Sequence, residues 1–69
     1  MIQETMLFIA RKELNSLEQE RNHLNNMIAY CNDQEDVIDI REKIEEIDAD
    51  IIIIRRNIIT FQKFMENIQ

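Results

Sequence analysis

The sequence contains no glycine and no proline, and it has one cysteine and one histidine among its 69 residues. Without glycine the chain cannot build a phosphate-binding loop or a tight oxyanion turn. A single cysteine excludes an intramolecular disulfide, and together with a single histidine it argues against a structural zinc site. The two residues that most disfavour a helix, glycine and proline, are therefore missing. The chain also lacks the disulfides and metal sites that stabilise many small domains.

Long apolar runs are also missing. The isoleucine tetrad at residues 51–54 is followed directly by Arg55 and Arg56, so no segment approaches the ~20 apolar residues that a membrane helix needs. The apolar run at residues 6–10 is too short for the core of a secretory signal, and Glu4 precedes it where a positive charge is usual. We therefore expect no membrane partner, and a cytoplasmic protein of a bacterial or viral-host cell.

Catalytic chemistry has few candidate residues in this chain. Ser16 and His23 are seven residues apart, roughly 10 Å along a helix, which is beyond hydrogen-bond reach. Glu20 and His23 match a Glu-x-x-His motif, but a single copy is more typical of an i,i+3 ion pair on a solvated helix face than of a metal site. We therefore expect no enzyme activity, no cofactor and no metal.

Apolar residues recur with alternating spacings of three and four in both halves of the chain. This is the a/d heptad pattern of helices that pack along one long face. The first seam consists of Gln3, Leu7, Ala10, Leu14, Leu17, Arg21, Leu24, Ile28 and Cys31. The second seam consists of Val37, Ile40, Ile44, Ile47, Ile51, Ile54, Ile58, Phe61, Met65 and Ile68.

A polar cluster between the two seams predicts a turn. Asn32 or Asp33 can cap the second helix, with Glu35 or Asp36 at the third position of a capping box. Because glycine is missing, Asn32 is predicted to take the left-handed conformation that ends many helices. The predicted bounds, within one domain of residues 1–69, are a helix over about 2–31, a turn over about 32–34 and a helix over about 35–68.

Counted outward from the turn, the two seams place apolar residues opposite each other in every layer except two. Arg21 faces Ile47, and Gln3 faces Met65. The predicted fold class is therefore all-α, an antiparallel two-helix hairpin of coiled-coil type, roughly 45–50 Å long. Arg21 either snorkels toward nearby acids or fixes the register of the seam, and we favour snorkelling.

Several large apolar residues lie outside both seams, mostly near the chain termini. Helices that are apolar over so much of their surface need a second contact, so we expect the hairpin to dimerise into a four-helix bundle. The same surface could instead dock another protein, and the two uses can coexist. The apolar residues predicted to bind a partner are Phe8, Ile9, Ile52, Ile53, Ile59 and Phe64.

The formal net charge is −6, and it is concentrated in one segment. Residues 33–50 hold nine acids against Arg41 and Lys43, a net charge of −7, whereas residues 51–69 carry +2. An acidic chain of this kind does not favour nucleic acid as a partner. The carboxylates predicted to steer a protein partner are Glu42, Glu45, Glu46 and Asp50, and mimicry of nucleic-acid phosphates is the alternative use for them.

A short acidic hairpin that dimerises into four helices resembles the plasmid repressor-of-primer RNA modulators over nearly the whole chain. That resemblance implies an RNA-binding regulator, for which the first helix offers only Arg11, Lys12 and Arg21. Residues 17–24 and 37–47 also look like the small aspartyl-phosphate phosphatases of sporulating bacteria. The Ser-Gln-x-Leu-Asp motif of that family would fall on residues 41–45, where only its leucine is approximated, so no catalytic role is carried over.

Fourteen isoleucines and seven asparagines suggest AT-rich coding, as in small phage or mobile-element genes. The sequence thus predicts a non-enzymatic, acidic protein-interaction module that self-associates and binds a protein partner as an inhibitor or regulator. The alternatives are an RNA regulator of the repressor-of-primer type, a phosphatase-like protein with a degenerate motif, and a nucleic-acid mimic.

Overall fold

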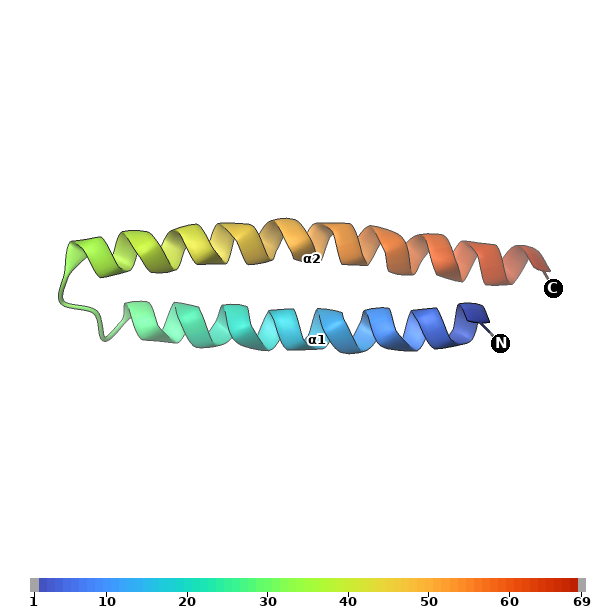
Figure 1. The fold of residues 1–69 in the computed structure, drawn as a ribbon, viewed down its shortest axis with the longest axis horizontal. Coiled ribbons are helices and arrows are strands. Elements are labelled where there is room, and N and C mark those ends of the chain that lie inside the picture. The colour runs from blue at the N-terminus through green and yellow to red at the C-terminus, as the bar shows by residue number, and fades with distance from the viewer. Residues whose placement is uncertain (1, 69) are drawn as a thin grey trace.

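The computed structural model describes residues 2–68, which form two α-helices and the turn between them (Figure 1). Helix α1 spans Ile2–Ile28 and helix α2 spans Gln34–Ile68. The helices run antiparallel in a rod with extents of 54 × 15 × 13 Å, and both termini lie at the end opposite the turn. The predicted all-α, antiparallel two-helix hairpin is confirmed.

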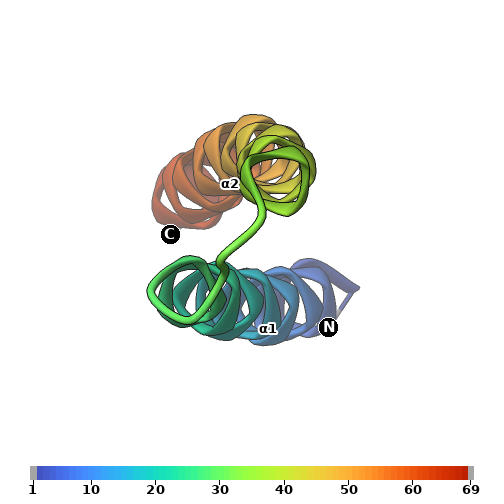
Figure 2. The same cartoon turned by 90° about the vertical axis from the view of Figure 1, so that its left-hand side faces the viewer.

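The two helices cross with a left-handed twist. Seen from the turn in Figure 2, α2 recedes toward the left above, while α1 recedes toward the right below. A seven-residue repeat allots 3.5 residues to each turn, slightly fewer than the 3.6 of a straight α-helix. Helices that keep such a seam in contact must therefore coil around each other left-handedly, as they do here.

The two predicted seams form the contact between the helices. Every described side chain of both seams is buried or half-buried, whereas nearly every position between them is exposed. The most deeply buried are Leu7, Ile47 and Ile51, which expose 9%, 4% and 2% of their surface. The side chains of Gln3 and Ile68, the outermost predicted seam positions, lie outside the described residues. A single seam leaves most of each helix surface in water, so the described core is small.

Helix α1 ends at Ile28, three residues earlier than the apolar spacing predicts. The chain tightens beyond this point, because the amides of residues 29–31 donate to the carbonyl oxygens of residues 26–28 at 3.0–3.2 Å. Bonds to the residue three positions back occupy carbonyl groups that the end of an α-helix leaves without a partner. Cys31 still lies half-buried at its predicted seam position.

The start of α2 is capped by Asp33. Its Oδ1 accepts a hydrogen bond from the amide of Glu35 at 3.0 Å, and its carbonyl oxygen accepts one from the amide of Val37 at 3.2 Å. The prediction of a left-handed Asn32 is wrong, because none of the described residues has a positive φ angle. Of the two predicted capping residues, the structure therefore selects Asp33, which satisfies an amide at the positive end of the helix dipole.

Candidate interaction surfaces

Large apolar side chains are exposed mainly at the end of the hairpin that carries the chain termini. Among the described residues eleven such side chains are exposed, of which eight lie in the half of the hairpin that carries the termini and three lie near the turn. The eight are Ile2, Met6, Phe8, Ile9, Ile52, Ile53, Ile59 and Phe64, and the three are Met27, Tyr30 and Ile38. The eight expose between 44% and 75% of their surface, so the hairpin alone leaves them in water.

Heptad positions show on which side of the hairpin each exposed residue lies. Successive residues are about 100° apart around a helix, so positions b and e lie on one side of an a/d seam and positions c and g on the other. Arg21, at a seam position, contacts Asp48 at 3.2 Å, and Arg55 contacts Glu18 at 2.9 Å. Asp48, Arg55 and Glu18 all occupy e positions. We call the b/e side the ion-pair face and the c/g side the opposite face.

The centre of the ion-pair face is polar. Arg21 lies in the seam, but its guanidinium donates outward to Asp48, as expected of a snorkelling side chain. The four paired side chains expose between 33% and 54% of their surface. Ion pairs this exposed typically contribute about 0–1 kcal/mol, so they orient the helices more than they hold them together. The large apolar residues at the edges of this face are Phe8, Ile52 and Ile59, and, near the turn, Ile38.

The opposite face changes character along the rod. Near the termini its central g positions hold Met6 and Phe64, which are both about half exposed. Along the middle of the rod, the same central line carries Glu13, Glu20, Asp50 and Asn57, and next to the turn it carries Met27 and Lys43. This face is therefore apolar near the termini and acidic along the middle of the rod. Its apolar part, which we call the terminal cluster, consists of Ile2, Met6, Ile9, Ile53 and Phe64.

The six apolar residues predicted to bind a partner are all exposed, but the structure divides them between the two faces. The ion-pair face carries Phe8, Ile52 and Ile59, and the opposite face carries Ile9, Ile53 and Phe64. The predicted set omits Ile2 and Met6, which complete the terminal cluster. The signal that identifies them is their heptad position, because c and g share one side of the hairpin with Phe64 and Ile53.

The four predicted acidic contacts are also exposed, but they do not form one stripe. Glu45 lies at a b position on the ion-pair face, whereas Glu46 and Asp50 lie on the opposite face. Glu42, at an f position, points away from α1. Carboxylates spread over about 140° of the circumference of α2 cannot all contact one flat basic surface. Their arrangement therefore suits general electrostatic attraction better than mimicry of a phosphate backbone.

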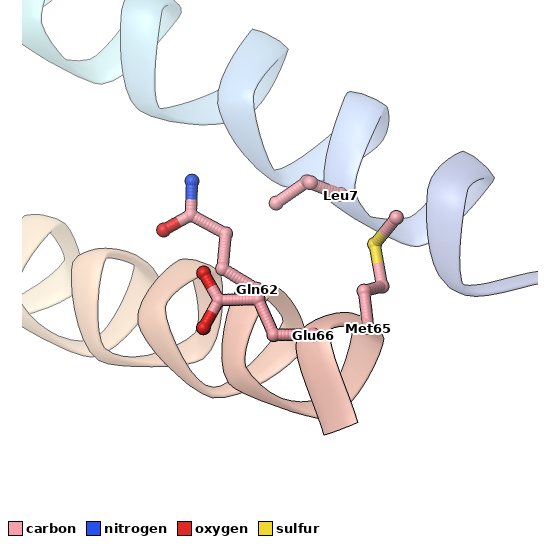
Figure 3. Close-up of a pocket in the computed structure, with 4 residues that line it drawn as sticks. All are labelled: Leu7, Gln62, Met65 and Glu66. Carbon is pink, nitrogen blue, oxygen red and sulfur yellow. The ribbon is translucent and has the colours of Figure 1, made fainter. Parts of the chain in front are cut away.

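A shallow depression of about 350 Å³ lies between the helices near the termini, on the ion-pair face (Figure 3). It is lined by Leu7 from α1 and by Gln62, Met65 and Glu66 from α2. Leu7 and Met65 belong to the seams, so the depression is a gap where the contact between the helices widens. One amide and one carboxylate do not supply the converging polar groups of a small-molecule site.

Glu20 and His23, which match the Glu-x-x-His motif, lie at g and c positions on the opposite face. Within residues 2–68 there is no group of three or more His, Cys, Asp and Glu side chains that could hold a metal ion. Over the same residues, neither helix has a stretch of the length and apolarity needed to cross a bilayer. The two faces are therefore the features of the described structure best suited to recognition.

Comparison of the chain with models of protein families, with curated proteins and with solved structures found no match. The function proposed below rests on the exposed apolar side chains, the ion pairs and the charge distribution of the hairpin itself.

Proposed function

We propose that this chain is a non-enzymatic interaction module that dimerises into a four-helix bundle and binds a protein partner as an inhibitor or regulator. The observation that carries the proposal is the imbalance between core and surface. Among the described residues three large apolar side chains are buried, while eleven are exposed. A two-helix unit with so small a core is seldom stable alone, and covering its exposed apolar groups is the largest gain in free energy open to it.

Two apolar surfaces allow one hairpin to make two kinds of contact. One face can pack against a second copy while the other remains accessible to a different protein. Phe8, Ile52 and Ile59 stand at the edges of the ion-pair face, within the helices α1 and α2. Aromatic and aliphatic anchors on rigid elements are typical centres of binding energy at protein interfaces. We assign these three residues to the partner surface.

The acidic segment supports a partner with basic groups around an apolar groove. Residues 33–50 carry a net charge of −7, and their carboxylates are mostly exposed. Charges of this kind mainly accelerate encounter and exclude partners of like charge, and their influence fades as salt is added. Glu42, Glu45, Glu46 and Asp50 therefore act as steering groups, whereas the apolar side chains supply most of the affinity.

The basic residues of α1 favour a protein over RNA as the partner. Of the three cations that α1 offers, Arg21 is engaged by Asp48, which leaves Arg11 and Lys12. Affinity for nucleic acid grows with the number of phosphates neutralised, and the two cations left on α1 neutralise few. No third basic residue of α1 extends this pair into a stripe.

The proposal is tested by capture followed by measurement of affinity. The wild-type chain and a Phe8→Asp, Ile59→Asp double variant serve as baits in an extract of the host, and the captured protein is then purified and titrated calorimetrically against both. We expect the double variant to bind it about tenfold or more weakly, because both anchors are lost. The control is Asn15→Asp, which adds a charge at another b position of α1. Equal affinities for the wild type and the double variant would rule out the ion-pair face as the partner surface.

A further inference from the structure

We infer that the terminal cluster is covered by a second copy of this chain, which lies antiparallel to the first and overlaps it only near the termini. The two acidic turn ends then point away from each other at opposite ends of a longer rod. This inference rests on the self-association proposed above. It adds the face, the orientation and the extent of the contact.

The residues at the central positions of each face determine which face a second hairpin can cover. When two hairpins stack, the central e or g positions of the contacting face join the a/d core of a four-helix bundle. On the ion-pair face those positions hold Glu18, Asp48 and Arg55, whose charges would lose water. Near the termini of the opposite face, the central positions hold Met6 and Phe64. The part of the opposite face between Glu13 and the termini can therefore be covered without burying charge at its central positions.

The acidic residues limit how far two copies can overlap. The contact between Arg21 and Asp48 shows the register of the helices, and that register sets Glu20 level with Asp50 across the opposite face. A parallel pair of hairpins would stack this acidic layer on its own copy. A fully overlapped antiparallel pair would stack it on the layer that contains Glu13. Both arrangements bring carboxylates together in a place shielded from water, where like charges repel strongly.

Partial antiparallel overlap avoids these contacts. It places the terminal cluster of one copy on that of the other, and it leaves the −7 segments at residues 33–50 in solvent at the two far ends. The gap between the two acidic segments is then several times the Debye length of about 8 Å at physiological salt. The α2 segments that do meet, residues 51–69, carry only +2 each, so they repel far less than two acidic segments would.

The area of the terminal cluster is consistent with a contact of this size. Its five side chains expose 44–75% of their surface. At ~200 Å² for a fully exposed large side chain, this amounts to roughly 550 Å² on each copy. A pair of copies would then remove on the order of 1,000 Å² from water, which is about the lower bound for a specific interface.

Two neighbouring isoleucines test the choice of face. Ile53 and Ile52 are exposed to 55% and 51%, but Ile53 lies on the opposite face and Ile52 on the ion-pair face. We expect Ile53→Glu to weaken the dimer about a hundredfold or more in sedimentation equilibrium, and Ile52→Glu to leave it close to wild type. Circular dichroism should show that both variants remain helical, because neither side chain is buried within the hairpin. An equal loss of dimer in both variants would overturn the choice of face.

The orientation is tested by the distance between the two turns. In an Asn32→Cys, Cys31→Ala variant, spin labels mark the exposed turn residue of each copy, and the same sample is measured by small-angle X-ray scattering. Partial overlap predicts a label separation of about 70 Å and a maximum dimension of about 80 Å. A parallel pair would bring the labels within about 25 Å, and full antiparallel overlap would set them about 50 Å apart. Either of those results overturns this inference and leaves self-association standing, whereas a monomer at every concentration overturns both.

Discussion

Replacement of Ile51 by alanine should remove most of the stability of the hairpin. Ile51 exposes 2% of its surface and lies in the middle of the α2 seam. Truncation deletes three carbon atoms, which costs about 2.4 kcal/mol at about 0.8 kcal/mol for each. A residual cavity of ~60–80 Å³ adds about 1.5–2 kcal/mol. The total of about 4 kcal/mol is comparable to the ~3–10 kcal/mol of stability typical of a chain this long.

Thermal unfolding followed by far-ultraviolet circular dichroism measures this loss. Wild type, Ile51→Ala and the control Ile52→Ala are compared at one protein concentration, because association makes the melting temperature depend on concentration. At about 4–8 °C per kcal/mol, Ile51→Ala should lower the Tm by more than about 15 °C, whereas Ile52→Ala, 51% exposed, should shift it by a few degrees. Similar shifts in the two variants would refute the assignment of the seam.

Three further predictions concern the cap, the seam arginine and RNA. Asp33→Ala should cost about 1 kcal/mol of stability, because it removes the 3.0 Å hydrogen bond from the amide of Glu35. Asn32→Ala should cost much less, and equal losses in the two variants would contradict the assignment of Asp33 as the cap. Arg21→Met should change the free energy of unfolding by no more than about 1 kcal/mol, because the ion pair of Arg21 with Asp48 is partly exposed. A larger loss of stability would indicate that Arg21 fixes the register of the two helices. Hairpin RNA should show no binding at physiological salt in a fluorescence anisotropy titration. Salt-sensitive binding that is lost on substitution of Arg11 and Lys12 by alanine would instead favour an RNA regulator.

The fold could be predicted from the sequence because one periodic signal determines most of it. Apolar spacing of three and four identifies both seams, and the structure buries or half-buries every described seam residue. The end of α1 could not be obtained this way. Cys31 continues the apolar spacing and keeps its place at the seam, but the hydrogen bonds of residues 29–31 are no longer α-helical. Periodicity indicates which side chains face the partner helix. It does not indicate which hydrogen bonds the backbone makes at the end of a helix.

The candidate site could be predicted residue by residue, but not as a surface. Composition and spacing identify Phe8, Ile53 and Phe64 as apolar residues outside the seams, and all three are exposed. The structure divides them between two faces, and the ion pairs distinguish those faces. The contact between Arg55 and Glu18 shows which face carries the ion pairs. The four carboxylates predicted to steer a partner likewise occupy positions b, c, f and g around α2, so they do not share one face.

Sedimentation equilibrium of the wild-type chain over the micromolar range tests most directly whether the exposed apolar ends associate. Eight large apolar side chains in the half of the hairpin that carries the termini lie in water in the single hairpin. We therefore expect a mass of twice the 8.4 kDa of one chain, or more, that falls toward 8.4 kDa on dilution. A mass of 8.4 kDa at every concentration would contradict self-association. Those side chains would then remain exposed unless a different protein covers them.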